Sequence, residues 1–261
     1  MPVLEANGCR FHVALDGPVD APGLVLSNSL GATLAMWQPQ VEAFARHFRV
    51  LRYDARGHGR SAVTPGPYTV GQLAADVLAL VDAAGLREPC FCGLSMGGAT
   101  GLWLAAHAED RFRRYVVCNS VPWLGLPDTM LARAARVRRD GLTALAGPTL
   151  ERWFTAELRA REPATVAAVR DAFVATPVEG YAACCEALAQ YDVRDAIGSI
   201  TAPVLAIAGT HDPAPAPAVV AAWARRIPGA RYLELPAAHL SNLGAPAAFE
   251  TAVLEFLGGR A

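Results

Sequence analysis

The chain contains no lysine, so all 23 of its basic residues are arginines. This absence excludes a lysine Schiff base and a lysine general base. The net charge is only −1, which gives no basic surface of the kind that binds nucleic acid. No run of 18 apolar residues occurs, so the sequence predicts no membrane span. The first ten residues, MPVLEANGCR, lack the basic and apolar regions of a signal peptide, and we expect a cytoplasmic protein.

Cysteine is scarce and is not arranged for metal binding. No C-x-x-C pair occurs, and no histidine cluster accompanies the six cysteines at metal-ligand spacing. We therefore expect no metal site, and buried free thiols in a reducing compartment. The residues concerned are Cys9, Cys90, Cys92, Cys118, Cys184 and Cys185.

Apolar residues make up 53% of the 261, which is enough for a large core. Short apolar runs alternate with amphipathic stretches, and this alternation predicts an α/β fold with a mostly parallel central sheet flanked by helices. The strand candidates are 11–15, 24–27, 49–53, 90–93, 115–118, 204–208 and 231–235. The helix candidates are 39–47, 70–84, 96–108, 217–226 and 246–257.

One long segment breaks the alternation. Residues 122–195 contain helical patterns, many arginines and no convincing strand. We interpret them as a helical insertion, a candidate cap or lid, between two parts of a core formed by 1–121 and 196–261. A second structural subdomain without substrate contact is the alternative reading.

The strongest chemical signal is Gly93-Leu94-Ser95-Met96-Gly97, which fits G-x-S-x-G. It follows a strand candidate and opens a helix candidate, which is the context that this nucleophile turn requires. Ser95 is therefore the predicted nucleophile. The amides at the start of the following helix favour developing negative charge.

A serine nucleophile needs a base and an acid that orients the base. His239 follows the last strand candidate and precedes the last helix candidate, and Asp212 follows the strand candidate 204–208. Their order after Ser95 is the expected one. The end of the strand candidate 115–118 offers only Asn119, which is no carboxylate, so we predict Asp212 as the acid. His58 is interpreted as part of a structural loop near the site.

An acyl-transfer site also needs two donors for the oxyanion. The amide of Met96, next after the nucleophile, is one candidate. The other is the amide of Leu30, in the loop where an apolar strand runs into Ser27-Asn28-Ser29. Asn and Ser side chains are suited to holding such a turn by bonding nearby backbone.

With these residues in view, the sequence resembles the 3-oxoadipate enol-lactonases of the α/β-hydrolase superfamily almost end to end. The stretches that support this are LVLSNSLGATLAMWQPQ, FRVLRYDARGHGRS, FCGLSMGG, LERWFTAELRAR, ATPVEGYAACCEAL and AAHLSN. The resemblance implies the α/β-hydrolase fold, a Ser95–Asp212–His239 triad and a cap over 122–195. It also implies hydrolysis of a small anionic lactone in the catabolism of aromatic compounds by the β-ketoadipate pathway, without a cofactor.

A carboxylate on the substrate calls for an arginine from the cap. The candidates are Arg133, Arg136, Arg138, Arg139 and Arg152. We favour Arg133 because it lies early in the first cap helix. Trp153 and Trp123 are candidates for the pocket wall, with a core role as the alternative.

Rival functions share much of this pattern. A broader carboxylesterase or a cofactor-free perhydrolase would use the same triad, and a non-catalytic ligand-binding protein can retain its residues. A haloalkane dehalogenase is disfavoured because it needs a carboxylate in place of Ser95. No feature of the sequence indicates an oligomeric state.

Overall fold

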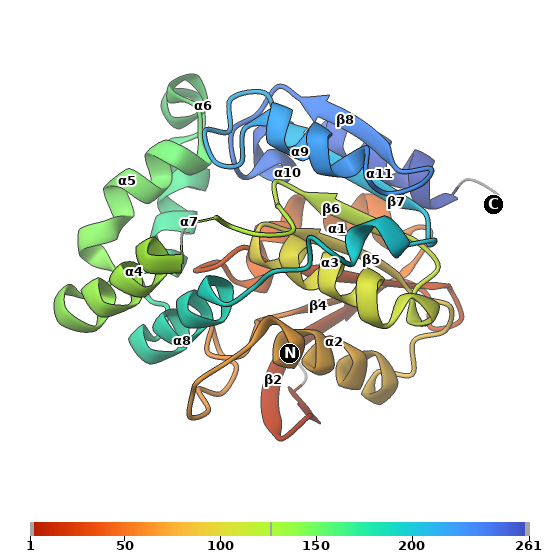
Figure 1. Cartoon of the computed structure of the whole chain (residues 1–261), viewed down its shortest axis with the longest axis horizontal. Helices are drawn as coiled ribbons and strands as arrows, with labels where there is room; N and C mark the ends of the chain where they lie inside the picture. The colour runs from red at the N-terminus through yellow and green to blue at the C-terminus, as the bar shows by residue number, and fades with distance from the viewer. Residues whose placement is uncertain (1–2, 126, 259–261) are drawn as a thin grey trace.

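The computed structural model describes residues 3–125 and 127–258. Within them, eight strands form one sheet in the order β1-β2-β4-β3-β5-β6-β7-β8 (Figure 1). The pairs β1–β2 and β2–β4 are antiparallel and all other pairs are parallel. The strands are β1 Val3–Ala6, β2 Cys9–Asp16, β3 Gly23–Ser27, β4 Arg49–Tyr53, β5 Cys90–Leu94, β6 Tyr115–Cys118, β7 Val204–Gly209 and β8 Arg231–Leu235.

All seven predicted strands are confirmed, and the sequence reading missed β1. This strand has four residues, lies at the sheet edge and is largely exposed, so it carries little hydrophobic pattern. A signal for it did exist. Asn7 and Gly8, both at positive φ, form the two-residue turn between β1 and β2, and Asn-Gly is a strong hairpin signal.

Helices cover both faces of the sheet. Alternate residues of the central strands enter two separate clusters: Val25 and Phe91 pack with α2, α3 and α9, whereas Leu24 and Cys90 pack with α1 and α11. Burial on both faces explains why these strands are continuous apolar runs. The helices are α1 Val41–Ala45, α2 Val70–Ala83, α3 Met96–His107, α4 Pro127–Asp140, α5 Thr143–Trp153, α6 Ala156–Arg161, α7 Pro163–Val174, α8 Val178–Ala189, α9 Pro217–Ala224, α10 Ser241–Gly244 and α11 Pro246–Gly258, with 3₁₀ turns η1 Leu34–Gln40, η2 Glu109–Arg111 and η3 Ile197–Ser199.

The described residues of the segment 122–195 are mostly helical. It contains α4 to α8, which Figure 1 shows grouped at one side of the sheet, and α4 packs along α8. Its two ends meet: Trp123 and Asp192 form a β-bridge, and the Val193 amide donates to the carbonyl of Pro122 at 2.9 Å. Apart from that bridge, the described residues of the segment form no strand.

All six cysteines lie in described residues, where they are buried and unpaired, which confirms the expectation of free thiols. Among the helices of residues 3–125 and 127–258, none is long and apolar enough to cross a membrane.

Candidate active site

Ser95 stands on a strained turn between β5 and α3. Its φ of 57° and ψ of −111° lie outside the regions that a non-glycine residue favours, and such strain is typical of functional turns. The glycines of the motif allow the close packing that this turn needs. A Cβ on Gly93 would lie 2.2 Å from the carbonyl oxygen of Gly97, and one on Gly97 would lie 2.2 Å from that of Ser27. The turn therefore requires both small residues.

Asp212 and His239 form a buried pair at the ends of β7 and β8. His239 Nδ1 lies 2.7 Å from Asp212 Oδ2, and both residues are almost fully buried. The side-chain amide of Asn119 donates to the same oxygen at 2.9 Å, and the backbone amide of Ala214 donates to Oδ1 at 3.0 Å. The carboxylate is thus held by three donors, with the imidazole oriented against it.

This arrangement sets the protonation states of the pair. Burial alone raises the pKa of Asp212, but His239, Asn119 and Ala214 outweigh it and hold that pKa below its usual value. Burial lowers the pKa of His239, and the charge of Arg152 lowers it further against the opposing effect of Asp212. His239 Nε2 is buried and bonds to no described residue. The imidazole is therefore neutral near pH 7, with a ring nitrogen available as a base.

Ser95 and His239 border the same cavity, of about 500 Å³, between the sheet domain and the segment 122–195. Its wall is mostly apolar, with two arginines, Arg133 and Arg152, among its lining residues. The segment also contacts the histidine loop directly, since the carbonyl of Arg152 accepts the His239 amide at 3.4 Å. The cavity thus brings together a serine hydroxyl, an imidazole and two guanidinium groups.

The loop after β3 is tied to the nucleophile turn. The Gly97 amide donates to the carbonyl of Asn28 at 2.9 Å. The Asn28 side chain is buried, donates to the Tyr53 carbonyl at 2.7 Å and accepts from the indole of Trp37 at 2.9 Å. The amides of Leu30 and Met96 donate no hydrogen bond to any described residue. Of the two residues, Met96 lines the cavity.

Arg152 places a positive charge in the wall of the cavity, where it is partly shielded from water. Burial lowers the pKa of its guanidinium, and the neighbouring charge of Arg133 adds to that effect. The Arg152 side chain forms no hydrogen bond or ion pair with a described residue. Arg133 is already engaged, donating to the Tyr181 hydroxyl at 2.6 Å and to Thr149 at 3.2 Å. An anion in the cavity would relieve this repulsion.

A family model described as the alpha/beta hydrolase fold matches residues 22–246. The chain belongs to the α/β-hydrolase family. It is 41% identical to 3-oxoadipate enol-lactonase 2 of Acinetobacter baylyi, over 96% of this chain and 94% of the relative. It is 48% identical to the enol-lactonase from Burkholderia xenovorans LB400, with a TM-score of 0.97 over 99% of this chain and 100% of that one. A thermophilic esterase from Thermogutta terrifontis, in a structure with malate bound, is 26% identical, with a TM-score of 0.94 over 99% and 98% of the two chains.

These comparisons confirm the resemblance to the enol-lactonases of the α/β-hydrolase family that the sequence motifs indicated. The structure brings Ser95, Met96, His239, Arg133 and Trp123 to one cavity. Asp212 and Leu30 do not line this cavity: Asp212 bonds His239 at 2.7 Å, and Leu30 lies in the loop after β3.

Trp153 is placed differently from the prediction of a pocket wall. It does not border the cavity but packs edge-to-face on Phe173, with ring centroids 5.5 Å apart, and is fully buried. Neighbouring helix positions point about 100° apart, so when Arg152 faces the cavity, Trp153 turns into the core. Sequence reasoning also missed the contact of Asn119 with Asp212.

Proposed function

We propose that this protein is a serine hydrolase that opens the lactone ring of 3-oxoadipate enol-lactone to give 3-oxoadipate, in the catabolism of aromatic compounds by the β-ketoadipate pathway. One observation carries the proposal: Ser95 and the Asp212–His239 pair meet at a cavity that also holds two arginines. The end-to-end similarity to enol-lactonases supports the choice of substrate. In this proposal residues 122–195 are the cap, and 1–121 with 196–261 are the catalytic core.

The first half-reaction begins with neutral His239. It removes the proton of the Ser95 hydroxyl, and the oxygen attacks the lactone carbonyl. The amides of Leu30 and Met96 bind the oxyanion that forms. Asp212 stabilises the imidazolium, because its carboxylate accepts from Nδ1 at 2.7 Å.

Collapse of the intermediate breaks the ring C–O bond. The enol oxygen leaves with a proton from His239 but stays tethered within the acyl group, where the enol ketonises. Ketonisation makes ring opening downhill. Water, deprotonated by His239, then attacks the acyl–Ser95 ester and releases 3-oxoadipate with Ser95 restored.

The cap arginines recognise the free carboxylate of the substrate. Arg152 has its guanidinium free of partners within the described chain, and Arg133 lies beside it with two of its donors used. In this proposal, Arg152 makes the main contact with the substrate carboxylate, and Arg133 adds charge to the same site. Both contacts would lower the KM for an anionic lactone without affecting a neutral ester.

Two sets of variants test the proposal. Ser95→Ala should lower kcat by about 10⁴–10⁶, as removal of a triad nucleophile does. Arg152→Leu and Arg133→Leu should raise KM for the enol-lactone and leave KM for p-nitrophenyl acetate unchanged. Arg136→Leu is the matched control, since Arg136 lies in α4 but does not border the cavity. Near-normal lactonase activity in Ser95→Ala, or equal KM shifts for both substrates, would contradict the proposal.

A further inference from the structure

His58 is a fully buried histidine that the mechanism above does not use. It lies in the turn after β4, and both its ring nitrogens have backbone partners. Nε2 accepts the amide of Gly31 at 2.9 Å, and Nδ1 lies 3.2 Å from the carbonyl oxygen of Arg56. An amide can only donate and a carbonyl can only accept. His58 is therefore neutral, with its proton on Nδ1.

Burial keeps the ring in that state, because it lowers the pKa of His58 against the opposing effects of the Arg56 carbonyl and Asp54. A protonated ring would set a second N–H against the Gly31 amide. The bond to Gly31 thus persists wherever the enzyme is folded and near neutral pH.

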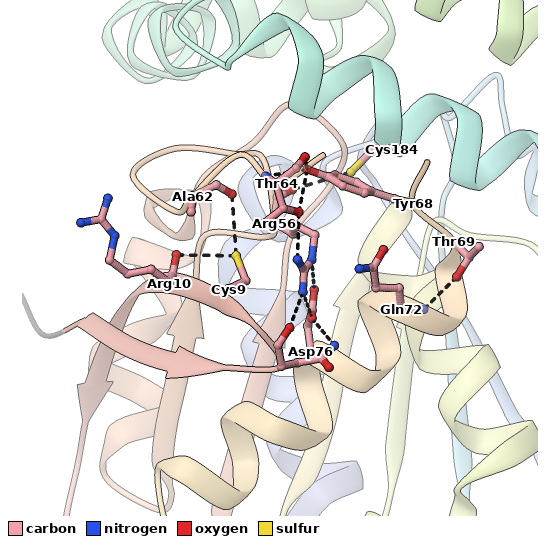
Figure 2. A network of polar contacts seen from close by, with 11 residues as sticks. Cys9, Arg10, Arg56, Ala62, Thr64, Tyr68, Thr69, Gln72, Asp76 and Cys184 are labelled. Carbon is pink, nitrogen blue, oxygen red and sulfur yellow. Dashed lines mark hydrogen bonds and ion pairs between the residues drawn. The ribbon is translucent and has the colours of Figure 1, made fainter. Parts of the chain in front are cut away.

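The partner of Nδ1 is itself fixed to the core. The Arg56 guanidinium bonds Asp76 of α2 at 2.5 and 2.8 Å, Thr64 at 2.9 Å and the carbonyl of Asn7 at 3.0 Å (Figure 2). Arg56 and Asp76 are almost fully buried. In Figure 2 the thiol of Cys184, from α8, points toward the same loop, and it lies 3.8 Å from the Arg56 carbonyl. The turn that carries His58 is therefore anchored by α2 on one side and α8 on the other.

The Gly31 residue is held from two directions. Its amide donates to His58, and its carbonyl accepts from the Thr176 hydroxyl at 3.4 Å. Gly31 has a φ of 80°, which suits a tight turn. The peptide that carries the Gly31 amide and the peptide that carries the Leu30 amide share the Leu30 Cα. Fixing the first therefore limits rotation of the second.

We propose that His58 is a positioning residue of the reaction: by accepting the Gly31 amide, it holds the Leu30 amide in the orientation that binds the oxyanion. The inference rests on the proposed function, because it needs the Leu30 amide to act as an oxyanion donor. Without His58 the buried Gly31 amide has no acceptor, and an unsatisfied buried donor drives the backbone to rotate. His58 bonds neither arginine of the cavity, and its one link to them is the Tyr181 ring, 6.4 Å away between centroids, whose hydroxyl accepts from Arg133. We therefore expect the main effect on kcat rather than on KM.

Three variants test this inference. His58→Leu removes the acceptor, and His58→Gln replaces Nε2 with a carbonyl of similar reach. His12→Leu is the matched control, since His12 is a buried histidine that bonds Asp54 at 2.7 Å and makes no contact with Gly31. Each is assayed for kcat and KM with the enol-lactone and with p-nitrophenyl acetate, and for thermal unfolding. If His58→Leu does not fold, His58→Asn, whose amide is one methylene shorter than that of Gln, takes its place.

We expect His58→Leu to lower kcat on both substrates by about 10- to 100-fold, with KM changed less than about threefold, because losing an oxyanion donor outright costs about 10²–10³. His58→Gln should recover most of that loss, and His12→Leu should change kcat less than about threefold. Equal kcat losses in His58→Leu and His12→Leu would overturn the inference. So would a His58→Gln variant that recovers none of the lost kcat, or a His58→Leu effect confined to KM. If the wild-type enzyme turns over the ester but not the lactone, only the proposed substrate is rejected. If the wild-type enzyme turns over neither, both the proposed function and the role of His58 are rejected.

Discussion

Substituting Gly31 tests how tightly the candidate oxyanion loop is packed. A Cβ added to this residue would lie 2.7 and 2.8 Å from Cδ2 and Cε2 of Phe173, and 3.0 Å from Cε2 of Tyr181. Both rings are buried and packed edge-to-face, with centroids 5.7 Å apart, so neither has space to withdraw. The φ of 80° adds strain for any residue with a Cβ.

The loss of stability in Gly31→Ala follows from the clash of the added Cβ and from the strain of the left-handed backbone. A left-handed backbone costs about 1–2 kcal/mol for alanine, and overpacking of a core costs about 1–3 kcal/mol. Gly31→Ala should therefore lower the free energy of unfolding by about 2–5 kcal/mol. For a chain of this size that is a fall in Tm of about 4–20 °C. Because the loop must shift, kcat should fall as well.

Thermal unfolding and ester hydrolysis measure the two effects. Gly258→Ala is the control: it makes the same chemical change at the exposed last residue of α11, where a Cβ has nothing within 4 Å. It should change the free energy of unfolding by less than about 0.5 kcal/mol, as exposed substitutions do. A Tm for Gly31→Ala within about 1 °C of the wild type would refute the packing argument.

Three further predictions concern the acid–base pair and the buried network. The value of kcat/KM should fall as the pH drops through the pKa of His239, with a midpoint below 6.5. Arg152→Leu should move that midpoint up, because the charge of Arg152 lowers the pKa of His239. A pH–rate profile of the wild type with a midpoint above 6.5 would contradict this. Asn119→Ala should lower kcat/KM by about 10- to 100-fold, because a hydrogen bond to a charged group is worth about 1.5–3 kcal/mol; steady-state kinetics that match the wild type would count against that contact. Arg56→Met should reduce the free energy of unfolding by about 3–5 kcal/mol, because it leaves Asp76 buried without its cation. Adding Asp76→Leu should restore more than half of that free energy. Denaturant unfolding of the double variant that shows no such recovery would contradict this.

The sequence predicted the central sheet well because buried parallel strands are continuous runs of apolar residues. Cys90–Leu94 and Val204–Gly209 are continuous apolar runs, since both faces of the sheet are covered. Ser95 and Asp212 were predicted from the ends of these two runs, and His239 from the end of the more polar strand Arg231–Leu235. The exposed edge strand β1 gave no comparable signal beyond its Asn-Gly turn.

The sequence could not predict which face of each helix in residues 122–195 meets the cavity. Arg133 and Arg136 lie three positions apart on α4, yet only Arg133 of the two borders the cavity. Which face does so depends on the packing between α4, α5 and α8. The orientation of Trp153 could not be predicted either, since it is next to Arg152 in the sequence but is buried in the core. The contact of His58 with the Gly31 amide depends on the long-range placement of the loops after β3 and β4, which leaves no local pattern in the sequence.

The proposed function requires that the enzyme prefer an anionic lactone, because Arg152 and Arg133 border the cavity of Ser95 and His239. Its most direct test is kcat/KM for the enol-lactone generated in the assay, compared with kcat/KM for p-nitrophenyl acetate on the same enzyme. We expect the lactone to be preferred by at least about 100-fold, because a charge-assisted contact is worth about 1.5–3 kcal/mol and two arginines are present. Equal turnover of both substrates, or turnover of the ester alone, would contradict it.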